Sequence, residues 1–237
     1  HGMLYALYNL EMLKSNTDGA GTWSDVTALI PGTISSGRGL AFNPTTGVGY
    51  MLGSNQAARS NPGSASSVWT AAPVANISDA RGIIWDPYRG RFVAFGAGAA
   101  SAPAIWTATD IAFTQRTLTG AGGFALPVYQ MAAGPNGLVA CHGAGATFRV
   151  WTSPDSDTRT VNNPGISAGS YWLDYDDGRD EFVLLSSGGV STSPDGITWS
   201  YVGGVAVGSK LLNTPTGICC FGGLWVVPGK TSIVGEP

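Results

Sequence analysis

The sequence predicts an all-β chain that folds as a β-propeller of four-stranded antiparallel blades. Its composition is the first indication: the 237 residues include 35 Gly and 14 Pro but only 11% charged residues, which is typical of a globular chain with many tight turns. The second is a hairpin phrase that returns about every 40 residues, and the third is another phrase between its copies. Two hairpins per unit, with no helical periodicity, predict propeller blades.

The first phrase couples an apolar strand, a turn rich in Asn, Asp, Pro and Gly, and a second apolar strand. In four copies an Asn or Asp stands four positions before a Gly, so the side chain is expected to cap the turn and the Gly to supply a positive φ. The third copy is shorter and uses Pro135 and Gly137. The copies are 39–53, 82–96, 130–143, 171–186 and 211–223, with the pairs Asn43/Gly47, Asp86/Gly90, Asp174/Gly178 and Asn213/Gly217.

The second phrase is an aliphatic-Trp-Thr strand followed by an Asp-bearing turn, at 67–73, 104–110 and 149–155, with a relative at 189–195. Recurrence of a tryptophan at one strand position predicts packing between repeats rather than contact with a ligand. The tryptophans are Trp69, Trp106 and Trp151.

The repeats predict a single domain over 1–237 with five blades. The fifth blade would combine both ends of the chain, 208–237 with 1–38, and so close the ring. A six-bladed ring with an irregular first blade is the alternative count, and a β-sandwich or β-prism is the alternative fold. The other four expected repeats are 39–80, 81–126, 127–167 and 168–207.

Residues 192–199, TSPDGITW, resemble the Asp-box hairpin of sialidase-like (BNR) propellers, in the form common in bacteriophage tail and fibre proteins. Residues 221–229, FGGLWVVPG, resemble a strand of the same repeats. In that family the Asp-box faces away from the binding face and stabilises a blade edge. The resemblance therefore implies structural roles for Ser193, Asp195, Gly196, Thr198 and Trp199.

The same resemblance implies a non-enzymatic recognition or structural module, a phage tail or fibre-type receptor-binding propeller located in a virion or outside the cell. Its ligand would be a cell-surface glycan or a neighbouring virion protein, and any trimer would form through flanking regions. A sialidase-like glycoside hydrolase is the first alternative. An intracellular assembly factor that docks a protein partner is the second.

Several observations speak against catalysis. A sialidase-like site needs an arginine triad, a Tyr with a nearby Glu, and an acidic Asp, yet the only Glu residues are Glu11, Glu181 and Glu236. No Cys/His spacing fits zinc, and His142 is expected to be a packed or hydrogen-bonded strand residue. We therefore expect no enzyme activity and no cofactor.

The three cysteines do not form a disulfide framework. Cys141, Cys219 and Cys220 stand in apolar, strand-like runs and are predicted to be buried free thiols.

The most acidic segment is DYDDGRDE, 174–181. Calcium prefers such oxygen clusters, but the spacing is not that of a calcium-binding loop, so a solvated turn is the favoured interpretation. The weak candidate metal ligands are Asp174, Asp176, Asp177 and Asp180.

Arg38 and Arg81 occupy matching positions, each just before the Gly that opens an inner strand. Near one mouth of a propeller channel they would hold an anionic group; the alternative is pairing with a neighbouring carboxylate such as Asp79. Tyr88, Tyr171 and Tyr201 are the candidate exposed rings for a sugar face.

The formal net charge of −3 and the pI near 5.2 argue against a nucleic-acid partner or an anionic membrane surface. No apolar run approaches the ~18 residues of a membrane span, so membrane insertion is not expected.

Overall fold

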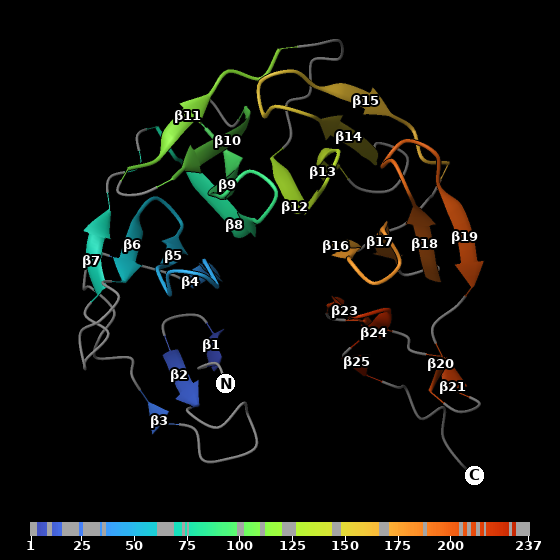
Figure 1. The fold of residues 1–237 in the computed structure, drawn as a ribbon, viewed down its shortest axis with the longest axis horizontal. Coiled ribbons are helices and arrows are strands. Elements are labelled where there is room, and N and C mark those ends of the chain that lie inside the picture. Colours follow the sequence, from blue (N-terminus) through green and yellow to red (C-terminus); the bar gives the residue numbers. More distant parts are fainter. Residues whose placement is uncertain are drawn as a thin grey trace. The chain divides into compact units, whose positions relative to one another are not determined.

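The fold is all-β, and no helix occurs in the part of the chain that the structure describes (Figure 1). The chain divides into two compact units, His1–Thr117 and Leu118–Pro237. Within the described residues, no helix is long and apolar enough to cross a membrane. The computed structural model describes residues 4–8, 11–15, 24–25, 34, 37–60, 69–72, 74, 76–98, 102–109, 112–119, 127–143, 148–165, 171–186, 189–203, 206–207, 210–211, 214–215, 217–227 and 229–230.

The first unit holds one three-stranded and two four-stranded antiparallel sheets, each a meander in chain order. The three-stranded sheet is β1 (Leu4–Tyr8), β2 (Glu11–Ser15) and β3 (Ser24–Asp25). The others are β4 (Gly37–Phe42), β5 (Gly49–Gly53), β6 (Ala57–Ser60) and β7 (Trp69–Ala72), then β8 (Asp79–Asp86), β9 (Arg91–Ala97), β10 (Pro103–Ala108) and β11 (Thr114–Arg116).

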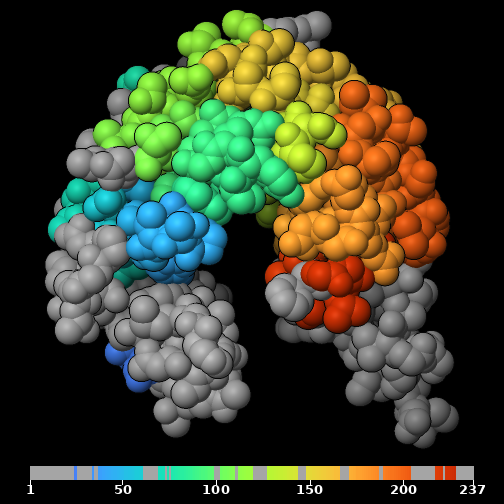
Figure 2. All heavy atoms as spheres, viewed as in Figure 1, coloured from blue at the N-terminus to red at the C-terminus, as the bar shows by residue number. Residues whose placement is uncertain are grey.

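The second unit holds two four-stranded antiparallel meanders and three strand pairs, of which β23–β24 lies against β16 and packs on buried residues of β17 (Figure 2). The meanders are β12 (Val128–Gly134), β13 (Gly137–His142), β14 (Arg149–Ser153) and β15 (Thr160–Asn162), then β16 (Tyr171–Asp176), β17 (Glu181–Ser186), β18 (Gly189–Ser193) and β19 (Ser200–Gly203). The pairs are β20 (Ala206–Val207) with β21 (Lys210–Leu211), β22 (Thr214–Pro215) with β25 (Gly229–Lys230), and β23 (Cys219–Phe221) with β24 (Leu224–Val226).

The predicted four-stranded antiparallel sheets are confirmed. One such sheet spans 37–72, another 79–116, another 128–162 and another 171–203. The number of blades and the closure of the ring by the two chain ends stay predictions.

The turn between the first two strands forms as predicted in two sheets. The Asn43 side-chain oxygen accepts hydrogen bonds from the backbone N–H groups of Thr45 (2.9 Å) and Thr46 (3.3 Å), and Gly47 has φ +70°. In the next sheet, Asp86 accepts from the Arg89 N–H at 3.2 Å, and Gly90 has φ +60°. The Asx side chain therefore replaces the missing backbone acceptors of the turn.

The predicted pair Asp174/Gly178 is wrong by two residues. Asp176 pairs with Glu181 across the hairpin as Asp86 pairs with Arg91, so Asp176 is the turn residue and Asp180 takes the positive φ (+56°). The spacing rule looked for Gly, whereas Asp also tolerates this backbone region. Asn213 of the last predicted pair lies outside the described residues.

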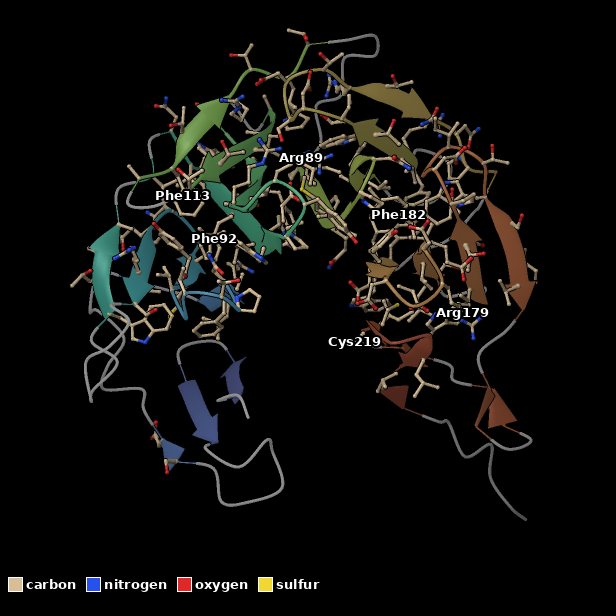
Figure 3. The ribbon with its side chains drawn as sticks, viewed as in Figure 1. Arg89, Phe92, Phe113, Arg179, Phe182 and Cys219 are labelled. Atoms are coloured by element: carbon tan, nitrogen blue, oxygen red, sulfur yellow. The ribbon has the colours of Figure 1, made fainter. Side chains whose placement is uncertain are left out.

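The repeated tryptophans belong to the core, as predicted. Trp106 and Trp151 are fully buried and Trp69 is 5% exposed. Trp106 shares a cluster with Tyr50 of the neighbouring sheet, against which Phe92 and Phe113 pack edge-on with ring centroids 4.7 and 4.9 Å away (Figure 3). Aromatic rings of adjacent sheets thus interlock in the first unit.

Replacing Trp106 with Ala should lower the free energy of unfolding by about 3–5 kcal/mol, because a large buried ring is lost and a cavity remains. Denaturant titration followed by circular dichroism measures this. Tyr201→Ala, at a 67% exposed ring, should cost less than about 1 kcal/mol; equal losses would contradict the assigned core.

Candidate functional site

The first strand of three sheets begins with a β-bulge, in which one residue has no partner on the second strand. Such an extra residue bends the strand and re-aims its side chain. The bulged residues are Arg38 in β4, Arg81 in β8 and Tyr129 in β12. Arg38 is exposed, the Arg81 side chain is 33% exposed, and Tyr129 is 36% exposed.

Arg38 and Arg81 lie at the same end of the neighbouring strands β4 and β8 in the first unit. Directly after them, a Cβ added to Gly39 would lie 2.9 Å from the Ile83 nitrogen and 3.2 Å from the Gly82 Cα. Only glycine fits so close an approach of two backbones. The predicted matching positions of Arg38 and Arg81 are therefore real neighbours in the fold.

Ser54 and Asp79 complete this cluster. The Ala80 N–H donates to the Ser54 carbonyl at 2.8 Å, and Arg38 Nε donates to Ser54 Oγ at 3.4 Å. Arg81 forms an ion pair with Asp79, at 2.5 Å. The alternative pairing considered for Arg81 is thus present, although both partners remain one-third exposed.

The three candidate tyrosines occupy different places in their own sheets. Tyr88 is 44% exposed in the turn at the far end of β8, and Tyr201 is 67% exposed on the outer strand β19. The predicted exposure of Tyr171 is wrong: its ring is buried and stacks on Phe148 with centroids 3.8 Å apart. With the corrected register, Tyr171 stands where Arg81 stands in β8, but its strand pairs regularly there.

The turn at 193–199 satisfies its own polar groups. Asp195 Oδ1 accepts from the backbone N–H groups of Ile197 (2.8 Å) and Thr198 (2.9 Å). Ser193 Oγ accepts from the Gly196 N–H at 2.8 Å and donates to Asp195 Oδ1 at 3.0 Å, while Trp199 Nε1 donates to the Gly196 carbonyl at 3.1 Å. These contacts support the structural role predicted for the five residues.

The same turn packs against the preceding sheet. Gly196 has φ +74°, and a Cβ there would lie 2.4 Å from Val139 Cγ2 in β13. Trp199 packs against the buried cluster that contains Val139. The turn is therefore a contact between sheets as well as a hairpin connection.

A divergent copy of this turn at 153–158 has the same geometry. Asp155 Oδ1 accepts from the N–H groups of Asp157 (2.8 Å) and Thr158 (2.7 Å), and Ser156 takes the positive φ (+78°). The hydrogen bonds from Thr158 and Asp157 lower the pKa of Asp155 to about 2, and those from Thr198 and Ile197 lower the pKa of Asp195. Both carboxylates are ionised at neutral pH.

The acidic segment is a docking point for the β23–β24 hairpin, and not a solvated turn throughout. Asp176 is fully buried and accepts from the Gly178 N–H (3.0 Å), the Gly223 N–H (2.9 Å) and Trp225 Nε1 (2.7 Å). Asp174 accepts from the Cys220 N–H at 2.8 Å. Burial would raise the pKa of Asp176, but these hydrogen bonds hold it below its usual value.

Arg179 covers this contact. Its Nε donates to the Gly223 carbonyl at 3.1 Å, and its guanidinium carbon lies 4.8 Å from the centroid of the Trp225 ring. A Cβ at Gly178 would lie 2.4 Å from the Gly223 nitrogen, so that glycine is needed for close approach and not for its φ. The turn and the hairpin are therefore in backbone contact.

The metal candidates Asp174, Asp176, Asp177 and Asp180 do not form a site. Across the described residues, no group of three or more His, Cys, Asp or Glu side chains is placed to hold a metal ion. Asp174 and Asp176 are used by N–H donors of the β23–β24 hairpin, and Asp180 accepts a hydrogen bond from the Tyr175 hydroxyl.

Cys141 and His142 are consecutive buried residues of β13. Burial, with smaller effects from Arg159 and Arg149, lowers the pKa of His142 to about 4, so it is neutral at pH 7. Burial raises the pKa of Cys141 to about 12, which leaves the thiol unreactive. The prediction of buried thiols is wrong for Cys219, which is exposed.

Sequence reasoning missed Tyr129 and the Asp176–Trp225 contact. Tyr129 was detectable, because it occupies the repeat position of Arg38 and Arg81 once the hairpins are aligned. The second contact joins residues 49 positions apart, and no local pattern indicates it.

No family model matches the chain, and no curated protein matches it. Many solved chains have a similar fold, and three serve as examples. They are virginiamycin B lyase from Staphylococcus aureus (TM-score 0.66, 14% identity, 92% of this chain and 70% of that chain), the nidogen/laminin complex (0.63, 12%, 96% and 84%) and YCF48 bound to D1 peptide (0.55, 16%, 80% and 60%).

These structures are β-propellers, and at such identities the likeness shows the fold alone. The class defined by the fold is therefore the β-propeller, as the sequence predicts. The chain spans 60% of the length of the YCF48 chain that it matches.

Replacing Asp195 with Ala should lower the free energy of unfolding at pH 7 by about 1 kcal/mol, since two backbone N–H groups lose a charged acceptor. The pKa of Asp195 is lowered in the folded state, so its stabilising contribution is present above the unfolded pKa near 4 and is lost as the pH falls below that value toward the lowered folded-state pKa. Urea titrations of wild type and variant should therefore converge over this pH range. A pH-independent difference would contradict the assigned role.

Replacing Asp176 with Ala should cost about 3 kcal/mol, because the Gly223 N–H and Trp225 Nε1 lose a buried charged acceptor. Limited proteolysis should then cut within 217–227, where wild type resists. Asp177→Ala, at an exposed neighbour in the same turn, is the matched control and should leave stability and cleavage unchanged.

Proposed function

We propose that the chain is a non-enzymatic recognition module: a five-bladed propeller, closed by its two ends, that binds a partner protein. The resemblance of residues 192–199 to an Asp-box supports a phage tail or fibre-type assembly, in a virion or outside the cell. In that setting the partner is a neighbouring virion protein or a cell-surface molecule.

The repeated bulge carries this proposal. A bulge leaves one residue unpaired with the neighbouring strand, and proteins use it where a side chain has to be re-aimed. Here it recurs at the start of the first strand in three successive sheets, and each time it displays a long side chain: Arg38, Arg81 or Tyr129. Neighbouring positions on these strands are occupied by core residues such as Met131 and Ile83.

A protein partner fits these side chains better than a glycan does. Sugar sites depend on aromatic rings gathered into one platform. The exposed rings of Tyr88, Tyr129 and Tyr201 stand at three different places in their sheets: a hairpin turn, a bulge and an outer strand. Two similar structures also hold a protein or peptide partner, laminin and the D1 peptide.

The environments of the carboxylates support a role without catalysis. Asp155, Asp174, Asp176 and Asp195 each accept backbone N–H donors, and Asp86 is fully buried beside Arg89 and Arg91. A general acid or base has to exchange its proton with a substrate, which such fixed contacts oppose. A lyase has a similar fold, so turnover is included in the test.

Partner binding at the bulge of the second unit is tested with a photo-crosslinking residue, p-benzoylphenylalanine, at position 129 of the chain in its native assembly. A discrete protein adduct is expected, identified by mass spectrometry. The matched control is the same residue at position 136, an exposed turn position at the other end of β12, which should give no adduct.

A glycan array and a panel of aryl-glycosides, sialosides included, test the alternatives on the purified chain. No saturable sugar binding and no turnover are expected. Sugar binding in place of a protein adduct would overturn the protein-partner proposal in favour of a lectin. Turnover that is lost in Glu181→Gln or Asp180→Asn would overturn the non-enzymatic assignment.

A further inference from the structure

We infer that Arg38 and Arg81 form a subsite for carboxylate groups, supplied by an acidic peptide segment of the partner. The inference rests on the proposed function and names the chemistry that one part of the surface recognises.

The fold holds the two arginines in a fixed relation. The contact of Gly39 with Ile83 and Gly82 locks β4 against β8, directly beside both bulges. The Ser54 carbonyl binds the Ala80 N–H, and the Ser54 hydroxyl reaches Arg38. Neighbouring backbones therefore hold the two bulges in place, while the contacts with Ser54 and Asp79 orient the two side chains.

The charges of this cluster favour an anion. The Asp79 carboxylate pairs with one of the two guanidinium groups, that of Arg81. The Arg81–Asp79 pair is one-third exposed, so solvent screens it and it can open at small cost. Arg38 donates to the uncharged hydroxyl of Ser54 over a long 3.4 Å contact. Guanidinium groups bind carboxylates through two parallel hydrogen bonds, which an exposed arginine can offer.

The surroundings favour a peptide carboxylate over a carboxylated sugar. A sugar ring needs an aromatic face beside the arginines. In the described part of the first unit, the large exposed aromatic residue is Tyr88, seven residues along from Arg81. At the rise of a β-strand this is about 20 Å away, which is too far for one sugar unit to contact both.

The test measures binding of fluorescein-labelled hexaglutamate to the purified chain by fluorescence anisotropy at low ionic strength. Saturable binding is expected, with an affinity that falls about tenfold or more in Arg38→Gln/Arg81→Gln. Asp79→Asn should tighten binding, because it removes the competing carboxylate. Thermal melts of every variant confirm that the fold is kept.

Arg116→Gln is the matched control, since it removes the same charge from the outer strand β11 of the same unit. It should leave the affinity within about twofold, because Arg116 is half-buried on β11, three strands away from β8 in the sheet, and does not offer a direct hydrogen bond to a carboxylate held by Arg38 and Arg81. An equal loss in this variant, an unchanged affinity in the double variant, or weaker binding in Asp79→Asn would overturn the subsite.

Competition with 3′-sialyllactose distinguishes the two sources of carboxylate. Binding of the sugar with none of the peptide would overturn the peptide assignment. An adduct at position 129 without any hexaglutamate binding would refute this subsite alone and leave the recognition function standing.

Discussion

The close approach of neighbouring first strands is the constraint on which the candidate site depends. At Gly39, the backbones of β4 and β8 meet at distances that leave no room for a single added carbon. Side chains cannot occupy that contact, so the long side chain of the preceding residue is carried outward on a bulge. A packing requirement between sheets thus produces the exposed positions of Arg38 and Arg81.

Aspartate side chains hold the other parts of the sheets together. Each of these carboxylates accepts several N–H groups at once in a turn that has few backbone acceptors. It therefore supplies the hydrogen bonds that a further strand would otherwise provide. Asp195 does this within its own turn, whereas Asp176 does it for a hairpin almost fifty residues away. A chain with so few charged residues uses these carboxylates for structure.

Such a scaffold can recognise a partner because its buried residues hold the sheets rigid while its bulged residues are exposed. The second and third strands are largely buried and fix the sheets, and the third strands β10 and β14 carry the fully buried Trp106 and Trp151. The bulged positions then carry residues whose identity can vary from sheet to sheet, Arg38 and Arg81 in one unit and Tyr129 in the other, without a cost to the core. Within each unit, this arrangement suits a binding position that is held in place before the partner arrives.

The sequence by itself determined the all-β class, the four-stranded repeats, the buried tryptophans and the Ser193–Trp199 turn, because each depends on contacts within a few residues or on a pattern that recurs. Tertiary structure decided the rest. It shifted the fourth hairpin by two residues to Asp176, buried Tyr171 against Phe148 and placed Tyr88 far from Arg81. Burial and close approach arise between segments distant in the chain, and a local pattern of residue types carries no information about which segments will meet.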